Sequence, residues 1–250
     1  MFVATCTPLH ITKNLAAAVA QGLNSDAAGF DLRAGGAGGL EAWIAGAGAV
    51  AAGAQRVLVV ASEASSHYAN PEDLPNALLF GDGAAALVLG PAGESNPSKG
   101  TLLFARSGTA SVAGMPFTVP GRLPPVEPSI ASGMYRFQRP DDRYKRGLEK
   151  VWESAAQHVL ADLAEAKQQA ASLLPYGVSR PQLEALASSV QLPVDAALSL
   201  LRERGCLGSA GALALVAQHI AHSAPAEQAQ VIASLAVGGG ISWCSLAWLG

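Results

Sequence analysis

Residues 30–40 read FDLRAGGAGGL, in which Phe-Asp-Leu-Arg is followed by an unbroken series of glycine and alanine. A related stretch, GSAGAL, occupies residues 208–213. Each stretch opens a helix rich in small residues. The apolar strand that follows begins 21 positions after Gly36 in the first case and 22 positions after Ser209 in the second. Such self-similarity is typical of an internal repeat. We therefore predict two copies of one helix–strand unit, packed back to back.

The rest of the chain also alternates between strand-like and helix-like patterns. The predicted strands are Phe2–Cys6, Gly29–Leu32, Val57–Ala61, Leu78–Leu89 with a Gly81-Asp82-Gly83 turn, Leu102–Ala105, Val231–Ala236 and a final strand that contains Cys244. The predicted helices are Ile11–Gly22, Gly36–Gly53, Tyr144–Leu163, Pro181–Ser189, Val194–Arg204 and one that starts near Ser209. This alternation indicates an α/β fold with buried sheets. Helices so rich in alanine and glycine can approach one another closely, which fits the middle layer of a sandwich.

A segment rich in proline, glycine and serine separates the two halves. Residues 107–140 have no clear hydrophobic period, which is typical of a long surface excursion. The predicted organisation is a first half at residues 1–106, this excursion, and a second half at residues 141–250.

Composition excludes several classes of function. Half of the 250 residues are hydrophobic and 14% are charged, so the chain can bury a large core. A net charge of −3 and the absence of a lysine and arginine cluster that would suggest a phosphate track argue against nucleic acid as a partner. The cysteines Cys6, Cys206 and Cys244 lie far apart without a CxxC pair, so no disulfide framework and no zinc site is predicted. A reducing cytoplasm fits this usage best, and we expect neither a metal nor another cofactor.

No membrane segment is predicted. The N-terminus lacks the basic flank and apolar core of a secretory signal. Residues 228–250 carry no charge and are numerous enough to span a bilayer. However, the glycines at 238–240 interrupt this run, and the residues on both sides favour two buried strands around a turn.

Three motifs in chain order resemble the thiolase superfamily, and most closely its β-ketoacyl-acyl-carrier-protein synthase III branch. Phe30-Asp31 followed by Ala37-Gly38 resembles the nucleophile segment Phe-Asp-x-x-x-x-Cys-Ala-Gly. Residues 80–84, FGDGA, resemble a turn of the same sequence. Residues 237–243, VGGGISW, resemble the family's Phe-Gly-Gly-Gly-hydrophobic-Thr-Trp loop. The resemblance covers nearly the whole chain and implies a layered αβαβα sandwich with two pseudo-symmetric halves.

The chain departs from this family at its start. It begins near Phe2 on a strand that the family reaches only after an opening strand–helix portion. The resemblance therefore implies an incomplete first half, in which a central strand is missing, comes from another chain or is encoded upstream.

A second departure concerns the nucleophile. Enzymes of this family place a cysteine at the N-terminus of the central helix, where the helix dipole and backbone N–H groups lower the pKa of the thiol. That position is Gly36 here, and Gly35 and Ala37 beside it also lack a nucleophile. Glycine has no side chain to carry an acyl group, so the resemblance implies that no acyl-enzyme forms at Gly36.

The family's histidine and asparagine are replaced as well. Leu174-Pro175 and Arg204-Gly205 stand where the family has its Pro-His and Gly-Asn motifs, which puts Tyr176 and Cys206 at the histidine and asparagine positions. A phenol with an ordinary pKa near 10 does not alternate between acid and base as imidazole does, and a thiol is a weak donor. The groups that can still outline an oxyanion hole are the backbone amides of Gly36, Gly238, Gly239 and Gly240.

The cysteines leave one rival reading of the chemistry. Cys206 precedes a predicted helix at Ser209, where a lowered thiol pKa would make it a substitute nucleophile. The alternative is that Cys206 is a small buried apolar residue. Cys6 and Cys244 fall in predicted strands, so we expect them in the core.

The leading hypothesis is a β-ketoacyl synthase III-like subunit of fatty-acid or polyketide-type metabolism that is not catalytic alone. Its expected partner is a homologous ketosynthase chain, in a heterodimer or homodimer, and acyl-CoA or acyl carrier protein are further candidates. One alternative is a divergent acyltransferase or thioesterase that acts on acyl-CoA or acyl-carrier-protein thioesters. Another is a protein that binds acyl chains in the emptied pocket.

Overall fold

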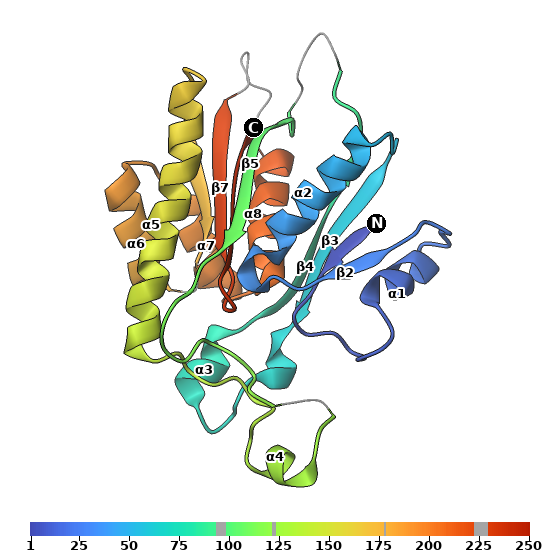
Figure 1. Ribbon diagram of the computed structural model, residues 1–250, viewed down its shortest axis with the longest axis vertical. Helices are drawn as coiled ribbons and strands as arrows, with labels where there is room; N and C mark the ends of the chain where they lie inside the picture. The colour runs from blue at the N-terminus through green and yellow to red at the C-terminus, as the bar shows by residue number, and fades with distance from the viewer. Residues whose placement is uncertain (94–98, 122–123, 178, 223–229) are drawn as a thin grey trace.

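Two four-stranded sheets enclose a pair of helices, and further helices cover the outer faces (Figure 1). The computed structural model describes residues 1–93, 99–121, 124–177, 179–222 and 230–250. The first sheet has the strand order β2-β1-β3-β4, and the second has the order β5-β8-β7-β6. Helices α2 and α8 lie between the sheets, α5 covers the outer face of the second sheet, and α1 covers the outer side of the first. The structure therefore has the predicted αβαβα layers.

The first half of the chain forms the first sheet and the helix that crosses its inner face. Its elements are β1 (Phe2–Ala4), α1 (Leu15–Gly22), β2 (Phe30–Leu32), a 3₁₀ turn η1 (Gly35–Ala37), α2 (Gly38–Ala51), β3 (Val57–Ala64), η2 (Ser65–Tyr68), α3 (Leu74–Leu79) and β4 (Asp82–Leu89). Strand β1 pairs in parallel with both β2 and β3, and β3 pairs antiparallel with β4.

The second half repeats this plan. Its elements are β5 (Leu102–Thr109), α4 (Glu127–Ala131), α5 (Asp142–Glu165), β6 (Ser172–Tyr176), α6 (Arg180–Val190), α7 (Asp195–Arg204), α8 (Ser209–His222), β7 (Val231–Val237) and β8 (Ser242–Leu249). Helix α8 leads to β7 and the antiparallel β8, as α2 leads to β3 and the antiparallel β4. The predicted repeat is confirmed. Strand β5 follows the first half in the chain but pairs with β8 in the second sheet.

Close contact between α2 and α8 explains the small residues at the start of each repeat. A Cβ at Gly39 would lie 2.5 Å from the carbonyl oxygen of Ser209 and 3.0 Å from Cβ of Leu213. Only glycine lets the two helix backbones approach this closely. Farther along the sandwich, the buried rings of Trp43 and Trp248 meet edge to face, with centroids 5.6 Å apart.

Several element boundaries differ from the predictions. Helix α1 begins at Leu15, not Ile11, because Asn14 caps it and the carboxylate of Asp31 accepts hydrogen bonds from the N–H groups of Leu15 and Ala16. The predicted strand at residues 78–81 is wrong: residues 74–79 are helical, with a proline in the first turn, and the glycines at 81 and 83 flank the start of β4. Strand β6 was absent from the predicted elements.

The excursion folds back against the body of the protein. It contains the short helix α4, and the N–H of Phe137 donates to the carbonyl of Tyr68 (2.8 Å). The uncharged residues 230–250 form the two strands β7 and β8, as predicted. Residues 228 and 229 of the same stretch lie outside the described part. Within the described residues, no helix has the length and apolar character needed to cross a bilayer.

Candidate functional site

A cavity of about 700 Å³ lies where the two halves meet. The residues predicted from the resemblance all line it: Gly36, Tyr176, Cys206, Gly238, Gly239 and Gly240. They come from η1, the end of β6, the connection between α7 and α8, and the β7–β8 connection. The cavity is therefore assembled from segments that lie up to about 200 positions apart in the sequence.

Tyr176 and Cys206 are direct partners. The phenol of Tyr176 donates a hydrogen bond to Sγ of Cys206 at 3.3 Å, and both side chains are buried. The backbone on either side of Cys206 is pinned to the α3–β4 connection, since its N–H donates to Leu79 O (2.7 Å) and its carbonyl accepts from Gly81 N (3.0 Å). The pair is therefore held rigidly at the bottom of the cavity.

Burial keeps both groups protonated. It raises the pKa of Tyr176 well above its usual range, and the neighbouring Cys206 adds to this shift. Burial also raises the pKa of the Cys206 thiol, although the hydrogen bond from Tyr176 opposes part of that rise. A thiol that is protonated at neutral pH is a poor nucleophile. The rival reading of Cys206 as a substitute nucleophile therefore gains no support from its surroundings.

Gly36 is surrounded by backbone. A Cβ added to Gly36 would lie 2.8 Å from the carbonyl oxygen of Val237 and 3.6 Å from the ring of Tyr176. The neighbouring Gly35 has a φ of +57°, and a Cβ there would meet Gly238 and Gly239 at 2.7 Å. The 35–36 and 237–239 backbones thus pack directly on each other. Any side chain at position 36 requires this packing to shift.

The predicted oxyanion donors differ in availability. The N–H of Gly238 donates to the carbonyl of Ser242 at 2.7 Å, so this amide is already used within the β7–β8 turn. The N–H groups of Gly36, Gly239 and Gly240 make no hydrogen bond with another described residue. The carbonyl of Gly239 accepts from the phenol of Tyr144, which orients the turn. The three amides without a described partner therefore belong to residues on both sides of the cavity.

A buried carboxylate next to these residues was not predicted. Glu63, at the end of β3, is 4% exposed and accepts hydrogen bonds from the N–H of Cys6 (2.9 Å), the hydroxyl of Thr7 (2.6 Å), and both the N–H (3.1 Å) and the hydroxyl of Ser209. Glu63 therefore joins the connection after β1 to the N-terminus of α8, and it lies 146 positions from Ser209 in the sequence. The sequence did hold a signal for this residue, because Glu63 is the one charged residue in the mainly apolar strand VLVVASEA.

Cys6 corrects a prediction. We expected Cys6 in the core, but the structure shows that it is exposed to solvent and lines the cavity. Strand β1 ends at Ala4, which leaves Cys6 in the connection beyond it. Desolvation and the nearby charge of Glu63 raise the pKa of the Cys6 thiol to about 11. Cys244, by contrast, is fully buried as expected.

One wall of the cavity is aromatic, which the sequence did not reveal. Phe80 precedes β4, while Phe117 and Phe137 belong to the excursion. Their rings lie with centroids 4.5–4.9 Å apart, and all three line the cavity. The excursion thus supplies an apolar cover for the cavity. Among the described residues, no group of three or more His, Cys, Asp or Glu side chains is arranged to hold a metal ion.

Comparisons with known proteins show which sequences the chain resembles. Residues 30–107 match the family model of 3-oxoacyl-[acyl-carrier-protein] synthase III. The chain is 29% identical to β-ketoacyl-[acyl-carrier-protein] synthase III 3 of Streptomyces coelicolor, over 99% of this chain and 75% of that protein. It is 26% identical to the synthase III of Desulfitobacterium hafniense, over 97% and 73%.

Solved structures show the same fold. The 3-oxoacyl-(acyl carrier protein) synthase III of Pseudomonas aeruginosa PAO1 superposes with a TM-score of 0.80 at 24% identity, covering 99% of this chain and 75% of that chain. The priming β-ketosynthase of the R1128 polyketide pathway superposes with a TM-score of 0.73, also at 24% identity, covering 99% and 73%. By sequence and by fold, the chain is a thiolase-like protein related to the β-ketoacyl-[acyl-carrier-protein] synthase III family.

Proposed function

We propose that this chain is a non-catalytic subunit of the β-ketoacyl synthase III type, which pairs with an active ketosynthase in fatty-acid or polyketide-type metabolism. The observation that carries the proposal is Gly36 at the head of the central helix. No side chain is present there to accept an acyl group, and a Cβ at this position would lie 2.8 Å from the carbonyl oxygen of Val237. The relatives named above supply the metabolic setting.

The other two positions support the same conclusion. Tyr176 and Cys206 are hydrogen-bonded to each other, and their raised pKa values keep both protonated at neutral pH. A pair in this state neither abstracts a proton nor attacks a thioester. These observations support a cavity that can bind a substrate but lacks reactive groups. The free thiols of all three cysteines suit a reducing cytoplasm, which we propose as its location.

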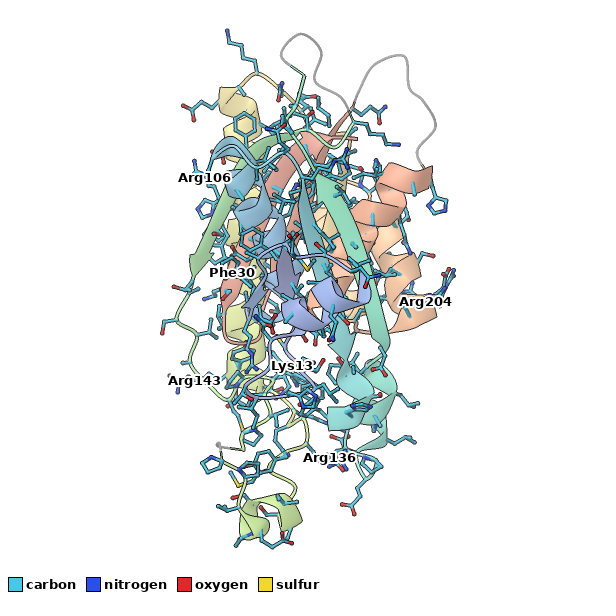
Figure 2. The ribbon with its side chains drawn as sticks, turned by 90° about the vertical axis from the view of Figure 1, so that its right-hand side faces the viewer. Lys13, Phe30, Arg106, Arg136, Arg143 and Arg204 are labelled. Carbon is cyan, nitrogen blue, oxygen red and sulfur yellow. The ribbon has the colours of Figure 1, made fainter. Side chains whose placement is uncertain are left out.

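An exposed apolar edge supports the pairing. Strand β2 lies at the edge of the first sheet, and Phe30 on this strand is 58% exposed (Figure 2). Other exposed apolar residues flank α1, including Ile11 (65%) and Leu23 (59%). An open strand edge with apolar neighbours is suited to pairing with a second chain.

Co-expression with an intact ketosynthase tests this proposal. We expect one species in size-exclusion chromatography with light scattering, with the summed mass of the two chains. The Phe30→Asp variant should elute separately from the partner. The Val88→Asp variant is the matched control, because Val88 is also exposed (69%) but lies on β4 at the opposite edge. Separate elution of the wild-type chain from every ketosynthase tried would count against the proposal.

The cavity favours a second candidate, the binding of acyl chains. Its volume of about 700 Å³ and its three phenylalanine rings suit an apolar chain, and the open amides suit a thioester carbonyl. Incubation with acyl-CoA should raise the melting temperature without a covalent mass gain. A gain abolished by Cys206→Ala would instead establish an active acyltransferase or thioesterase that uses Cys206.

A further inference from the structure

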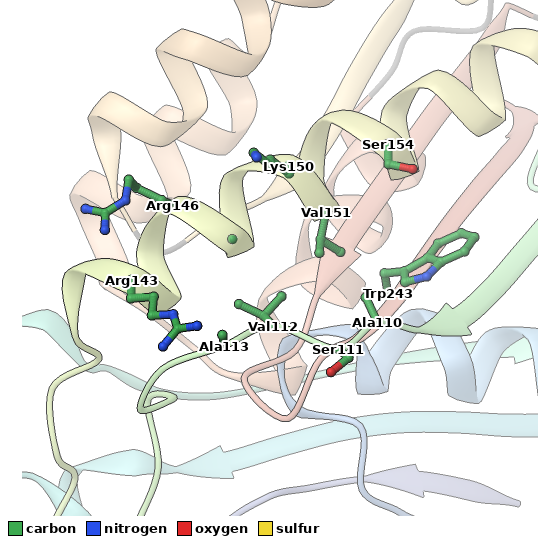
Figure 3. Close-up of a pocket in the computed structure, with 11 residues that line it drawn as sticks. Ala110, Ser111, Val112, Ala113, Arg143, Arg146, Lys150, Val151, Ser154 and Trp243 are labelled. Carbon is green, nitrogen blue, oxygen red and sulfur yellow. The ribbon is translucent and has the colours of Figure 1, made fainter.

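A second concavity, of about 500 Å³, lies between α5 and residues 110–113 (Figure 3). It shares no described lining residue with the central cavity, because the two line opposite faces of the same helix. We call it the α5 groove. Its lining residues are Ala110, Ser111, Val112, Ala113, Arg143, Arg146, Gly147, Lys150, Val151, Ser154 and Trp243.

Three cations gather along one face of α5. Arg143, Arg146 and Lys150 follow one another at spacings of three and four positions, which brings them to the same side of a helix. Figure 3 shows Arg143 directed toward the 110–113 segment, with all three on the α5 wall of the groove. This corrects the expectation that the chain has no lysine and arginine cluster, because the three cations come together only once the helix is formed.

The opposite wall is held in place by backbone contacts. The N–H of Ala110 donates to Ile241 O (3.0 Å), and the N–H of Met115 donates to the carboxylate of Asp141 (2.8 Å). Between these points, the side chain of Val112 packs directly against Gly147, where any Cβ would overlap it. The groove is thus a defined feature of the fold.

The charges of the groove have one sign. None of its described lining residues is acidic, and none of its three cations lies within 4.0 Å of a described carboxylate. The charges of Asp141 and Asp142, at the start of α5, interact with Arg143 and Arg146 only at longer range. In a chain with a net charge of −3, this is a local concentration of positive charge.

We propose that the α5 groove binds a phosphorylated small molecule. Guanidinium groups match phosphate oxygens with paired hydrogen bonds, and the hydroxyls of Ser111 and Ser154 add further donors. The apolar floor, formed by Val112, Val151 and Trp243, suits the organic part of such a ligand. The concave shape favours a small molecule over the flat surface of a protein.

Isothermal titration of the full chain at low salt tests this site, with inorganic pyrophosphate and AMP as probes. Both should bind, and Arg146→Ala should weaken binding about tenfold, the usual effect of one charge-assisted contact. The triple variant Arg143→Ala, Arg146→Ala, Lys150→Ala should show no binding. Arg56→Ala is the control, because Arg56 is an exposed cation outside the groove, and it should change affinity less than twofold.

The two probes also distinguish the parts of the ligand that are recognised. Tighter binding of AMP indicates that the organic part rests on the apolar floor, and equal binding indicates recognition of phosphate alone. Either result supports the site. Absence of binding by both probes, or equal binding by the triple variant at an unchanged melting temperature, overturns it. Neither outcome bears on pairing with a ketosynthase, which has its own test.

Discussion

The ring of Tyr176 lies directly against the backbone of Gly211, in the first turn of α8, in the space that a Cβ at that glycine would occupy. Tyr176 is a large residue at the position predicted for a histidine, and Gly211 is what makes room for it. The two residues therefore form a matched pair, although 35 positions separate them in the sequence. This part of the cavity is therefore closely packed, with no free space at Gly211 for a larger residue.

The first prediction concerns this pair. Gly211→Ala should destabilise the protein by about 1–3 kcal/mol, because the new methyl group displaces the ring of Tyr176 in a packed core. Gly48→Ala is the matched control, since Gly48 lies in α2 with open space around its Cβ, and it should be neutral or stabilising by up to about 1 kcal/mol. Urea unfolding measures both. Equal effects of the two substitutions would contradict the packing argument.

A second prediction concerns a cysteine at position 36, which the resemblance assigns to the nucleophile. Gly36→Cys alone should not produce an acyl-enzyme with acetyl-CoA, as judged by intact-mass spectrometry, because Tyr176 and Cys206 remain in place. It should also lower the free energy of unfolding by about 1–3 kcal/mol, since the Cβ lies 2.8 Å from the oxygen of Val237. An acetylated product from a variant of wild-type stability would show that only the thiol was missing.

A third prediction concerns Glu63. Glu63→Gln replaces one of two accepting oxygens by an NH₂ group, which leaves buried donors near Ser209 and Thr7 without a partner. The expected loss is about 1–3 kcal/mol of unfolding free energy. Glu72→Gln, at an exposed position, should change stability by less than about 0.5 kcal/mol. If Glu63→Gln were as stable as this control, the hydrogen bonds of the Glu63 carboxylate would contribute nothing to the free energy of unfolding.

A fourth prediction concerns thiol reactivity. In the folded protein, N-ethylmaleimide should add once, at Cys6, because Cys206 and Cys244 are buried. Only the thiolate reacts, and a pKa of about 11 makes it scarce at neutral pH. The labelling rate should therefore rise about tenfold per pH unit between pH 7 and 9. Cys6→Ser should abolish the adduct, and rapid labelling of Cys206 in the native state would contradict its burial.

A fifth prediction concerns alkaline pH. The pKa of Cys206 is higher in the folded state than its ordinary value of 9.0, so the unfolded chain loses this proton first as pH rises. The contribution of Cys206 to stability is thus complete below pH 9 and declines above it; Tyr176 acts in the same sense above pH 10. The variant Tyr176→Phe, Cys206→Ala should lose less stability than wild type between pH 8 and 10.5, measured by urea unfolding.

The sequence by itself determined the α/β class, the internal repeat and the position of Gly36 at the head of the central helix. These depend on local patterns: glycine and alanine spacing marks helices that pack closely, and short motifs mark the turns. Even the convergence of Gly36, Tyr176 and Cys206 was implied by the order of the motifs. Element boundaries were less well predicted, because the caps at Asn14 and Asp31 involve residues from two different segments.

Only the tertiary structure decided what surrounds these residues. The cavity is also lined by Glu63, Cys6 and Phe117. Their positions depend on contacts between residues far apart in the sequence, and the local hydrophobic pattern does not predict such contacts. Tyr176 and Cys206 form a hydrogen bond because the fold brings two distant segments together. Their pKa values rise because the fold also buries both side chains. Burial and charge are properties of packed neighbours, so they exist only after the two halves of the chain meet.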